Sequence, residues 1–169
     1  MARRGNRITP QFIIRDFRDS DEAPVIALVR ELQAHESQSY DRMRPAEEIG
    51  SWYVQFLKDD ISKHRGSFLV AEMGEAIVGY ATLLTEVSSA EERDEILYTF
   101  AHVGDLAVAA SHRGVGIGFA LLSECERRAR AAGQKWLRLG VHAGNREARK
   151  FYSQAGLQEA FLTLEKRLI

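Results

Sequence analysis

Short apolar runs alternate along the chain with longer segments in which apolar residues recur every three or four positions, which predicts strands and helices in turn. The strand-like runs are FIIRDF (12–17), SFLVAE (67–72), AIVGYATLL (76–84), the segment 96–108, WLRLGV (136–141) and a closing arm, LQEAFLTLEK (157–166). The tight turn MGE joins the second run to the third, so we expect a hairpin there.

Two helices are predicted between the first strand and the hairpin. The first follows the cap-forming residues 19–21, and its apolar positions at helical spacing are Val25, Leu28, Val29 and Leu32. Pro45 opens the second, EEIGSWYVQFLKDDISK (47–63), because proline is tolerated in a first helical turn. Its broad apolar face comprises Ile49, Trp52, Tyr53, Phe56 and Leu57. We expect that face to pack in the core.

Two more helices are predicted in the second half. One runs from about Val115 to Ala132, directly after a glycine-rich turn, and ends at Gly133. Its inward face comprises Ile117, Leu121, Leu122, Cys125 and Ala129. Cys125 is therefore expected to be a small core residue rather than a nucleophile. A short helix is predicted over 147–154.

The alternation of strands and helices, together with an antiparallel hairpin, predicts an α/β (α+β mixed) fold with a central, mixed, twisted sheet flanked by helices. A chain of 169 residues suits one domain with one substantial core. We expect residues 1–10 to form a flexible basic extension and residues 11–169 to form a single domain. The acidic stretch SSAEERDE (88–95) is too polar to bury much and is expected to be a surface loop.

Composition argues against several classes of function. The formal net charge of −1 gives no global electrostatic reason to bind nucleic acid or an anionic membrane. One cysteine cannot form an internal disulfide or a multi-cysteine zinc site, and no metal is expected. No stretch approaches the ~18 consecutive apolar residues of a membrane span, and no apolar signal core follows the basic start. We therefore expect a soluble, cytoplasmic protein.

The stretch HRGVGIGFALL (112–122) places glycine at every second position and then runs directly into an apolar helical pattern. A strand, a glycine-rich turn and a helix N-terminus together can bind an anion, because the free N–H groups of the first helical turn point outward and the helix dipole adds positive charge. A phosphate can approach the bare backbone of Gly114, Gly116 and Gly118 closely. The sequence therefore predicts a phosphate-bearing ligand at this turn.

Two common phosphate-binding motifs do not fit these glycines. A P-loop requires G-x-x-x-x-G-K-[ST], and no Lys-Ser or Lys-Thr pair follows. The dinucleotide fingerprint G-x-G-x-x-G, started at Gly114, would place Phe119 where close packing of helix and strand needs glycine or alanine. Started at Gly116, the same fingerprint reaches Leu121 in place of its third glycine.

The pattern that fits is L-x-V followed by R-G-x-G-x-G, carried by Leu106, Val108, Arg113, Gly114, Gly116 and Gly118. It resembles motif A of the GCN5-related N-acetyltransferase family. A second segment, VHAGNREARKFYSQAGL (141–157), is similar to that family's V-x-x-x-N-x-x-A-x-x-F-Y-x-x-x-G-F, with Leu157 in place of the usual aromatic residue. Ala110 stands where family members often carry proline, a change that keeps the backbone donors. Two signatures in the right order imply the acyl-CoA N-acyltransferase fold.

The resemblance implies acetyl-CoA as the co-substrate. In the family the loop and helix hold its pyrophosphate, which here implicates Arg113, Gly114, Val115, Gly116, Ile117 and Gly118. The strand through Leu106, Ala107 and Val108 would offer backbone groups to the pantetheine arm. Asn145 resembles the family asparagine that contacts the pantetheine or pyrophosphate region, although capping of the following helix would also explain it.

Candidate catalytic residues follow from the same resemblance. Tyr152 lies two helical turns beyond Asn145, where a family tyrosine commonly protonates the departing thiolate of coenzyme A. A half-buried core tyrosine is the alternative reading. Direct transfer also needs a neutral amine, so some group must accept the proton of the ammonium. His102 and Asp105 are the candidates, with Glu72 and an ordered water as rivals.

The predicted function is an N-acetyltransferase that moves an acetyl group from acetyl-CoA directly to a primary amine. A non-catalytic acyl-CoA-binding sensor, and an acyltransferase with another acyl donor or an oxygen acceptor, stay open as alternatives. The acceptor, a small molecule or a protein amine, has no readable motif, although one or two of Trp52, Tyr53 and Phe56 would line its pocket if they are not core residues. Nucleic acid and membrane are not expected as partners, and a homodimer stays open.

Overall fold

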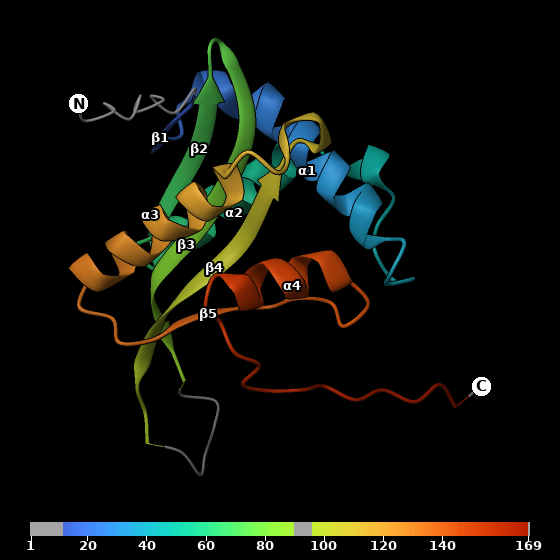
Figure 1. Cartoon of the computed structure of the whole chain (residues 1–169), viewed down its shortest axis with the longest axis vertical. Coiled ribbons are helices and arrows are strands. Elements are labelled where there is room, and N and C mark those ends of the chain that lie inside the picture. Colours follow the sequence, from blue (N-terminus) through green and yellow to red (C-terminus); the bar gives the residue numbers. More distant parts are fainter. Residues whose placement is uncertain (1–11, 90–95, 169) are drawn as a thin grey trace, which may run out of the picture.

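The computed structural model describes residues 12–89 and 96–168, so the extension predicted at 1–10 and most of the acidic stretch lie outside it. One sheet has the strand order β1-β2-β3-β4-β5 (Figure 1). The strands are β1 (Ile13–Asp16), β2 (Ser67–Met73), β3 (Ala76–Ser88), β4 (Thr99–Val108) and β5 (Leu137–Leu139). Neighbouring strands are antiparallel except β4 and β5, which are parallel. The predicted mixed sheet and its β2–β3 hairpin are therefore confirmed.

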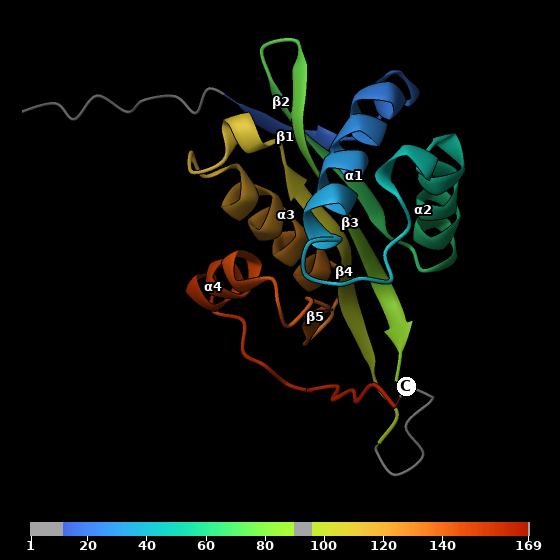
Figure 2. The ribbon, with the colours of Figure 1, turned by 90° about the vertical axis from the view of Figure 1, so that its right-hand side faces the viewer.

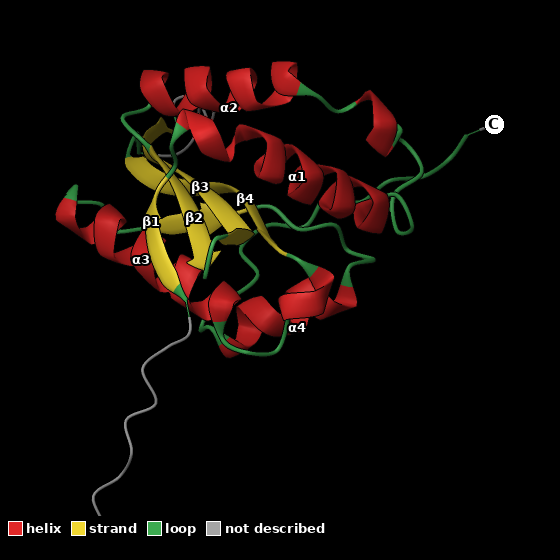
Figure 3. Ribbon diagram, turned by 90° about the horizontal axis from the view of Figure 1, so that it is seen from above, coloured by secondary structure: helices red, strands yellow, loops and turns green. Residues whose placement is uncertain are grey.

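Helices cover both faces of the sheet. They are α1 (Glu22–Glu36), α2 (Ser51–Lys63), α3 (Ile117–Ala131) and α4 (Arg146–Gln154). Seen from above in Figure 3, α1 and α2 lie on one side of the sheet, and α3 and α4 lie on the other. In the described ranges, no helix has the length and apolar character needed to cross a membrane.

The buried residues divide into two cores, one on each face of the sheet. The predicted inward faces of α1 and α3 are confirmed by the burial of Val25, Leu28, Val29, Ile117, Leu121, Leu122, Cys125 and Ala129. Burial raises the pKa of the Cys125 thiol to about 12. The thiol is therefore protonated at neutral pH, in agreement with the core role predicted for it.

The second helix begins later than its sequence pattern indicates. Residues Ala46–Glu48 form a separate 3₁₀ turn. Extended backbone at Ile49 and Gly50 then interrupts the chain before α2 starts at Ser51. Pro45 therefore precedes a single turn and not the helix itself.

The predicted core face of α2 is wrong for two of its aromatic residues. Trp52 and Phe56 are 51% and 55% exposed. Val54, which the pattern did not include, is buried together with Leu57, so these positions lie on the side of α2 that packs inward. Ile49, which the predicted face included, lies before the helix in extended backbone. Helix α2 therefore presents an aromatic surface to its surroundings instead of burying it.

Three strand predictions also differ from the structure. The run predicted as a strand over 136–141 pairs with β4 only over three residues, and β4 itself begins at Thr99 rather than at residue 96. The closing strand predicted over 157–166 is wrong, because that segment has no regular secondary structure. It leaves α4 as an extended chain that runs away from the sheet (Figure 1).

A β-bulge in β4 determines which of its side chains reach each face of the sheet. Gly104 and Asp105 together oppose the single residue Thr82 of β3. The Thr82 hydroxyl accepts the Asp105 N–H at 2.9 Å, which satisfies a group that the bulge removes from the ladder. The extra residue shifts the alternation of side chains, so Val103 and Leu106 both pack in the α3 core. Asp105 turns instead toward α1 and α2.

Candidate active site

Beyond the end of β5, no strand among the described residues pairs with the outer edge of β4. Strand β5 pairs with β4 only over Ala101–Val103. The Ala109 N–H donates to the Val78 carbonyl, so the backbone of Ala109 faces β3. The backbone groups of successive strand residues point to opposite sides, so those of Leu106 and Val108 point to the outer edge of β4. By the same alternation, the backbone of the third predicted contact, Ala107, faces β3. A strand-like ligand could therefore pair with Leu106 and with the Val108 N–H, while the Val108 carbonyl already accepts a hydrogen bond from Arg113 Nε at 3.0 Å.

The glycine turn connects this strand to α3. Gly114 and Gly116 have φ values of +79° and +92°, a region that favours glycine, and the space that a Cβ would occupy is open at both. Gly116 is the N-cap of α3 and offers no side-chain acceptor. The first N–H groups of this helix therefore have neither an intrahelical acceptor nor a side-chain cap, as an anion site requires. The side chain of Ile117 is buried, so only its N–H could serve that site.

Gly118 has a different reason for lacking a side chain. A Cβ at this position would lie 3.3 Å from Cζ of Phe151 on α4. Phe151 also packs edge-on against Phe119, with ring centroids 4.8 Å apart. The Phe151 ring therefore restricts the space for a side chain at Gly118, and the glycine allows α4 to approach α3. The predicted ligand contact of the Gly118 N–H stays a prediction.

We expect Gly118→Val to destabilise the fold by about 1–3 kcal/mol, because the Phe151 ring must move to admit the added methyl groups. Thermal unfolding followed by circular dichroism measures the loss. Ser123→Val adds the same side chain at an exposed position of α3 and serves as the control. Phe151→Leu should recover part of the loss in the double variant. If Gly118→Val unfolds at the wild-type temperature, the contact between the helices is looser than we describe.

Arg113 and Asn145 already have partners within the chain. Arg113 Nε donates to the Val108 carbonyl at 3.0 Å, and a guanidinium nitrogen lies 3.5 Å from Glu31 of α1. Both charged side chains are substantially exposed, so this ion pair is weak and leaves Arg113 able to turn toward an anion. Asn145 caps α4, because its Oδ1 accepts the Ala148 N–H at 3.1 Å. The predicted capping role is confirmed, and its ligand contact stays a prediction.

Tyr152 lies on α4 and packs against the α3 core. Burial raises its pKa to about 12, and the charges of Glu36 and Asp105 act in the same direction. The phenol is therefore protonated at neutral pH, which is the state in which it can donate a proton. These charges come from α1 and β4, so three elements converge on the same region.

Asp105 is held by two tyrosines. Its carboxylate accepts the Tyr53 hydroxyl at 3.1 Å and the Tyr80 hydroxyl at 2.9 Å. Burial raises the pKa of Asp105, although both hydrogen bonds oppose that rise. Burial also raises the pKa of each tyrosine, so both remain hydrogen-bond donors. The β4 bulge and these two donors therefore fix a buried carboxyl group in one orientation.

Glu36, the last residue of α1, is a candidate that the sequence analysis missed. Burial raises the pKa of its carboxyl, the charge of His142 lowers it, and the charge of Asp105 raises it further. Tyr40 stacks on His142 with centroids 4.6 Å apart, which joins the loop after α1 to the loop after β5 near α4 (Figure 2). In the sequence Glu36 lies in a charged stretch where nothing separates it from an ordinary exposed carboxylate.

The other two predicted proton acceptors are not brought into this cluster. Burial lowers the pKa of His102, and the charge that acts on it is that of Asp60 on α2. Glu72 lies on β2, which β3 separates from β4, and it pairs with Arg15. Of the predicted acceptors, Asp105 alone shares its electrostatic surroundings with Glu36 and Tyr152.

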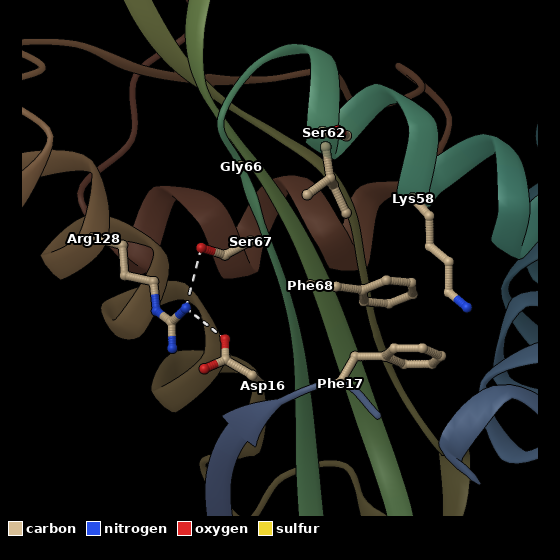
Figure 4. A pocket seen from close by; sticks show the side chains of 9 residues that line it. Asp16, Phe17, Lys58, Ser62, Gly66, Ser67, Phe68 and Arg128 are labelled. Atoms are coloured by element: carbon tan, nitrogen blue, oxygen red, sulfur yellow. Dashed lines mark hydrogen bonds and ion pairs between the residues drawn. The ribbon is translucent and has the colours of Figure 1, made fainter. Parts of the chain in front are cut away.

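A hollow of about 310 Å³ between β1, β2, α2 and α3 contains no residue of the glycine turn (Figure 4). Its two cations already have carboxylate partners: Arg128 donates to Asp16 at 2.6 Å, and Lys58 donates to Asp19 at 2.8 Å. Arg128 also donates to the Ser67 hydroxyl at 3.1 Å. This hollow is therefore a poorer anion site than the uncapped N-terminus of α3.

Comparisons with known proteins agree with this geometry. The profile of the Acetyltransferase (GNAT) family matches residues 27–157. The "Uncharacterized N-acetyltransferase YhfO" of Bacillus subtilis (strain 168) is 30% identical over 146 residues, which cover 86% of this chain and 89% of that protein.

Solved structures give the same fold. A mutant of the BH1408 protein from Bacillus halodurans aligns with a TM-score of 0.82 at 23% identity, over 93% of this chain and 99% of that chain. A GCN5-related N-acetyltransferase from Ralstonia eutropha JMP134 aligns with a TM-score of 0.68 at 18% identity, over 92% and 98% of the two chains. At these identities the structures establish the shared fold alone.

Proposed function

Because the chain belongs to the Acetyltransferase (GNAT) family, we propose that it transfers the acetyl group of acetyl-CoA directly to the primary amine of an acceptor. Membership of the family supports an acyltransferase function, and the fold is that of acyl-CoA N-acyltransferases. The proposal of acetyl-CoA and a direct transfer rests mainly on one arrangement. The unpaired edge of β4 leads through the glycine turn to the uncapped N-terminus of α3, and the protonated Tyr152 and the buried carboxyl group of Asp105 lie in the same region.

The residues of this chain fit the two ends of acetyl-CoA. The N–H groups at the start of α3 would hold the diphosphate, and Arg113 would add a cation beside them. The backbone groups of Leu106 and Val108 would pair with the amides of the pantetheine arm, as an added strand does. When bound, acetyl-CoA supplies an activated thioester that a neutral amine can attack. An N–H of the same edge would donate to the thioester carbonyl oxygen.

Tyr152 is the proposed proton donor to the leaving thiolate. With its pKa raised to about 12, the phenol is protonated at neutral pH but is a weaker acid than a free phenol. Part of that rise comes from the charges of Glu36 and Asp105. When either carboxylate is neutralised by a bound ammonium or by a proton, the pKa of Tyr152 falls back toward its ordinary value. Deprotonation of the amine would thus prepare Tyr152 to donate.

Asp105 is the proposed acceptor of the amine proton. Its raised pKa makes it a better base than an exposed aspartate, and its hydrogen bonds from Tyr53 and Tyr80 hold it in place. Glu36, at the end of α1, would attract the incoming ammonium to the same region. The proton would pass to Asp105 directly or through a water molecule.

We expect Asp105→Asn to lower kcat/KM at neutral pH by about 10²–10⁴-fold and to remove the acidic limb of its pH profile. In the wild-type enzyme, activity should fall as the pH falls through the pKa of Asp105, because the protonated carboxyl cannot accept a proton. That limb should lie above the ordinary aspartate value of about 3.9, since burial raises this pKa. Steady-state rates measured across pH test the expectation.

His102→Gln is the matched control for Asp105→Asn, since it removes the other predicted acceptor on β4 and should keep the acidic limb. Unchanged acetyl-CoA affinity would show that Asp105→Asn leaves the fold intact. If Asp105→Asn retains the wild-type limb, then Asp105 is not the proton acceptor.

The function itself is tested by thiol release from acetyl-CoA in the presence of a panel of small amines and peptides with free amines. The proposal predicts turnover that depends on the amine and yields an N-acetylated product. Tight binding of acetyl-CoA without turnover by any amine would contradict catalysis and favour a sensor of acyl-CoA. Comparison with propionyl-CoA and succinyl-CoA measures the preference for the acyl chain.

A further inference from the structure

We propose that Glu31 of α1 is a positioning residue for the acetyl-CoA site. Its carboxylate fixes the turn that leads from β4 to the glycines, and it holds Arg113 on the Val108 carbonyl, from which Arg113 must move when the pantetheine arm binds. This role rests on the proposed function, since Glu31 would act on acetyl-CoA only through the turn.

One oxygen of Glu31 contacts the segment between β4 and α3 at two points. Oε1 accepts the backbone N–H of Ala110 at 2.7 Å, and it lies 3.5 Å from a guanidinium nitrogen of Arg113. The first contact joins a charged acceptor to a backbone donor, a kind of hydrogen bond that is stronger than one between neutral groups. The second contact is long and both side chains are exposed to water, so it is the weaker of the two.

The contact with Ala110 caps a turn that has no cap of its own. Residues Ala110–His112 form a single 3₁₀ turn, and Ala109 before it has no side chain that could accept a hydrogen bond. As in a longer helix, the first N–H groups of such a turn have no partner within it. Glu31 therefore supplies the cap from another element, and it fixes the direction in which the chain approaches Gly114.

Helix α1 gives Glu31 a rigid support beside this turn. Leu28, one helical turn before Glu31, is buried in the same core as Ala107 of β4, and Ala109 packs against that core. The packing that places α1 on the sheet therefore also places the carboxylate next to the end of β4. A carboxylate on a loop would lose more conformational entropy in making the same contact.

Arg113 lies where part of the ligand would bind. Its Nε donates to the Val108 carbonyl at 3.0 Å, and that carbonyl points to the outer edge of β4, which the pantetheine arm would follow. The weak contact with Glu31 allows Arg113 to exchange this position for a diphosphate oxygen, a stronger partner. The hydrogen bond from Ala110 does not depend on this exchange, so the start of the turn stays in place.

Proline at position 110 separates the cap from the charge of Glu31. Ala109 has φ −48° and ψ 134°, an extended conformation that suits a residue before proline, and Ala110 is the first residue of a helical turn, where proline is favoured. Ala110→Pro should therefore keep the path of the chain and remove the N–H that Glu31 accepts. Glu31 is partly exposed, so its side chain can move away from the proline ring.

Calorimetry with acetyl-CoA on two Glu31 variants tests the proposal. Glu31→Gln keeps an oxygen acceptor and loses the charge, whereas Glu31→Ala loses both. We expect Glu31→Gln to bind about 2–5-fold more tightly than the wild type, because Arg113 loses its ion pair in the free protein. Glu31→Ala should bind about 5–10-fold more weakly than Glu31→Gln, because the turn loses its cap.

The same comparison in chains that also carry Ala110→Pro identifies the cause. There the two Glu31 variants should bind acetyl-CoA equally, within about 2-fold, because no N–H remains to be capped. In the original background, the difference between them should appear in the KM for acetyl-CoA and not in kcat, since Glu31 contacts none of the reacting groups.

Hydrogen exchange of the Ala110 amide, measured by NMR without ligand, is the second test. It should be about 10-fold faster in Glu31→Ala than in the wild type and within about 3-fold of the wild type in Glu31→Gln. Equal affinities of the two single variants, a difference that persists with Ala110→Pro, or Glu31→Gln binding no more tightly than the wild type would overturn the proposal. A wild-type chain that does not bind acetyl-CoA would contradict the proposed function instead, and the exchange rates would still decide whether Glu31 caps the turn.

Discussion

Replacement of Tyr152 by phenylalanine is expected to lower kcat by about 10²–10⁴-fold while the dissociation constant for acetyl-CoA changes by no more than a few-fold. The substitution removes one hydroxyl and keeps the ring, whose centroid lies 5.1 Å from that of Phe151. The loss should therefore fall on the protonation of the thiolate and not on the packing of α4. Thiol release at saturating acetyl-CoA, together with calorimetry, separates the two effects.

Tyr98→Phe is the control for this experiment, because the Tyr98 ring contacts Phe100 and Arg138 of the sheet and not α4. Its kcat should match that of the wild type. Because burial raises the pKa of Tyr152 to about 12, ionisation of the phenol should not reduce the wild-type rate at or below about pH 10. A Tyr152→Phe enzyme with the wild-type kcat would remove this residue from the mechanism.

Gly116→Val is expected to weaken acetyl-CoA binding by about 100-fold or more, for two reasons. The φ of +92° at Gly116 strains any β-branched residue, and the added side chain would occupy the open space in front of the first N–H groups of α3. Isothermal titration calorimetry measures the change in affinity, and thermal unfolding measures the strain.

Gly133→Val separates strain from ligand contact. Gly133 has a φ of +78° just beyond the opposite end of α3, and a Cβ there also meets open space. This variant should lose a comparable amount of stability and keep the wild-type affinity for acetyl-CoA. If both variants lose affinity equally, Gly116 acts only through the stability of the fold.

The glycine turn could be predicted because its signal is local. Positive φ at Gly114 and Gly116 and the uncapped start of α3 follow from a few consecutive residues, and the same is true of the cap that Asn145 provides for α4. The packing reason for Gly118 could not be predicted, since the ring that a side chain there would meet comes from Phe151, more than thirty residues later.

The buried carboxyl cluster could not be predicted in full because it depends on the tertiary structure. Asp105 faces α2 only because β4 bulges opposite Thr82, and its partner Tyr53 lies on a helix 52 residues earlier. Glu36 differs from other helical carboxylates only through burial against elements that are distant in the sequence. Strand register and helix packing decide such contacts, and neither can be read from a single segment.

The start of α2 and the C-terminal residues 157–168 show a second limit of local patterns. The apolar face predicted for the second helix includes Ile49, Trp52 and Phe56, but Ile49 lies before the helix in extended backbone, and both aromatic side chains are exposed. Residues 157–166 have the alternation of a strand but form no regular secondary structure, because alternation alone does not supply a strand with which to pair.

The central claim is that the turn through Gly114 and Gly116 receives the diphosphate of acetyl-CoA, and calorimetry with two ligands tests it most directly. Acetyl-CoA should bind with a dissociation constant in the micromolar range, whereas S-acetylpantetheine, which has the same arm and thioester but lacks the diphosphate and the 3′-phosphoadenosine attached to it, should bind at least about 100-fold more weakly. No detectable binding of acetyl-CoA, or equal affinity for both ligands, would contradict the account.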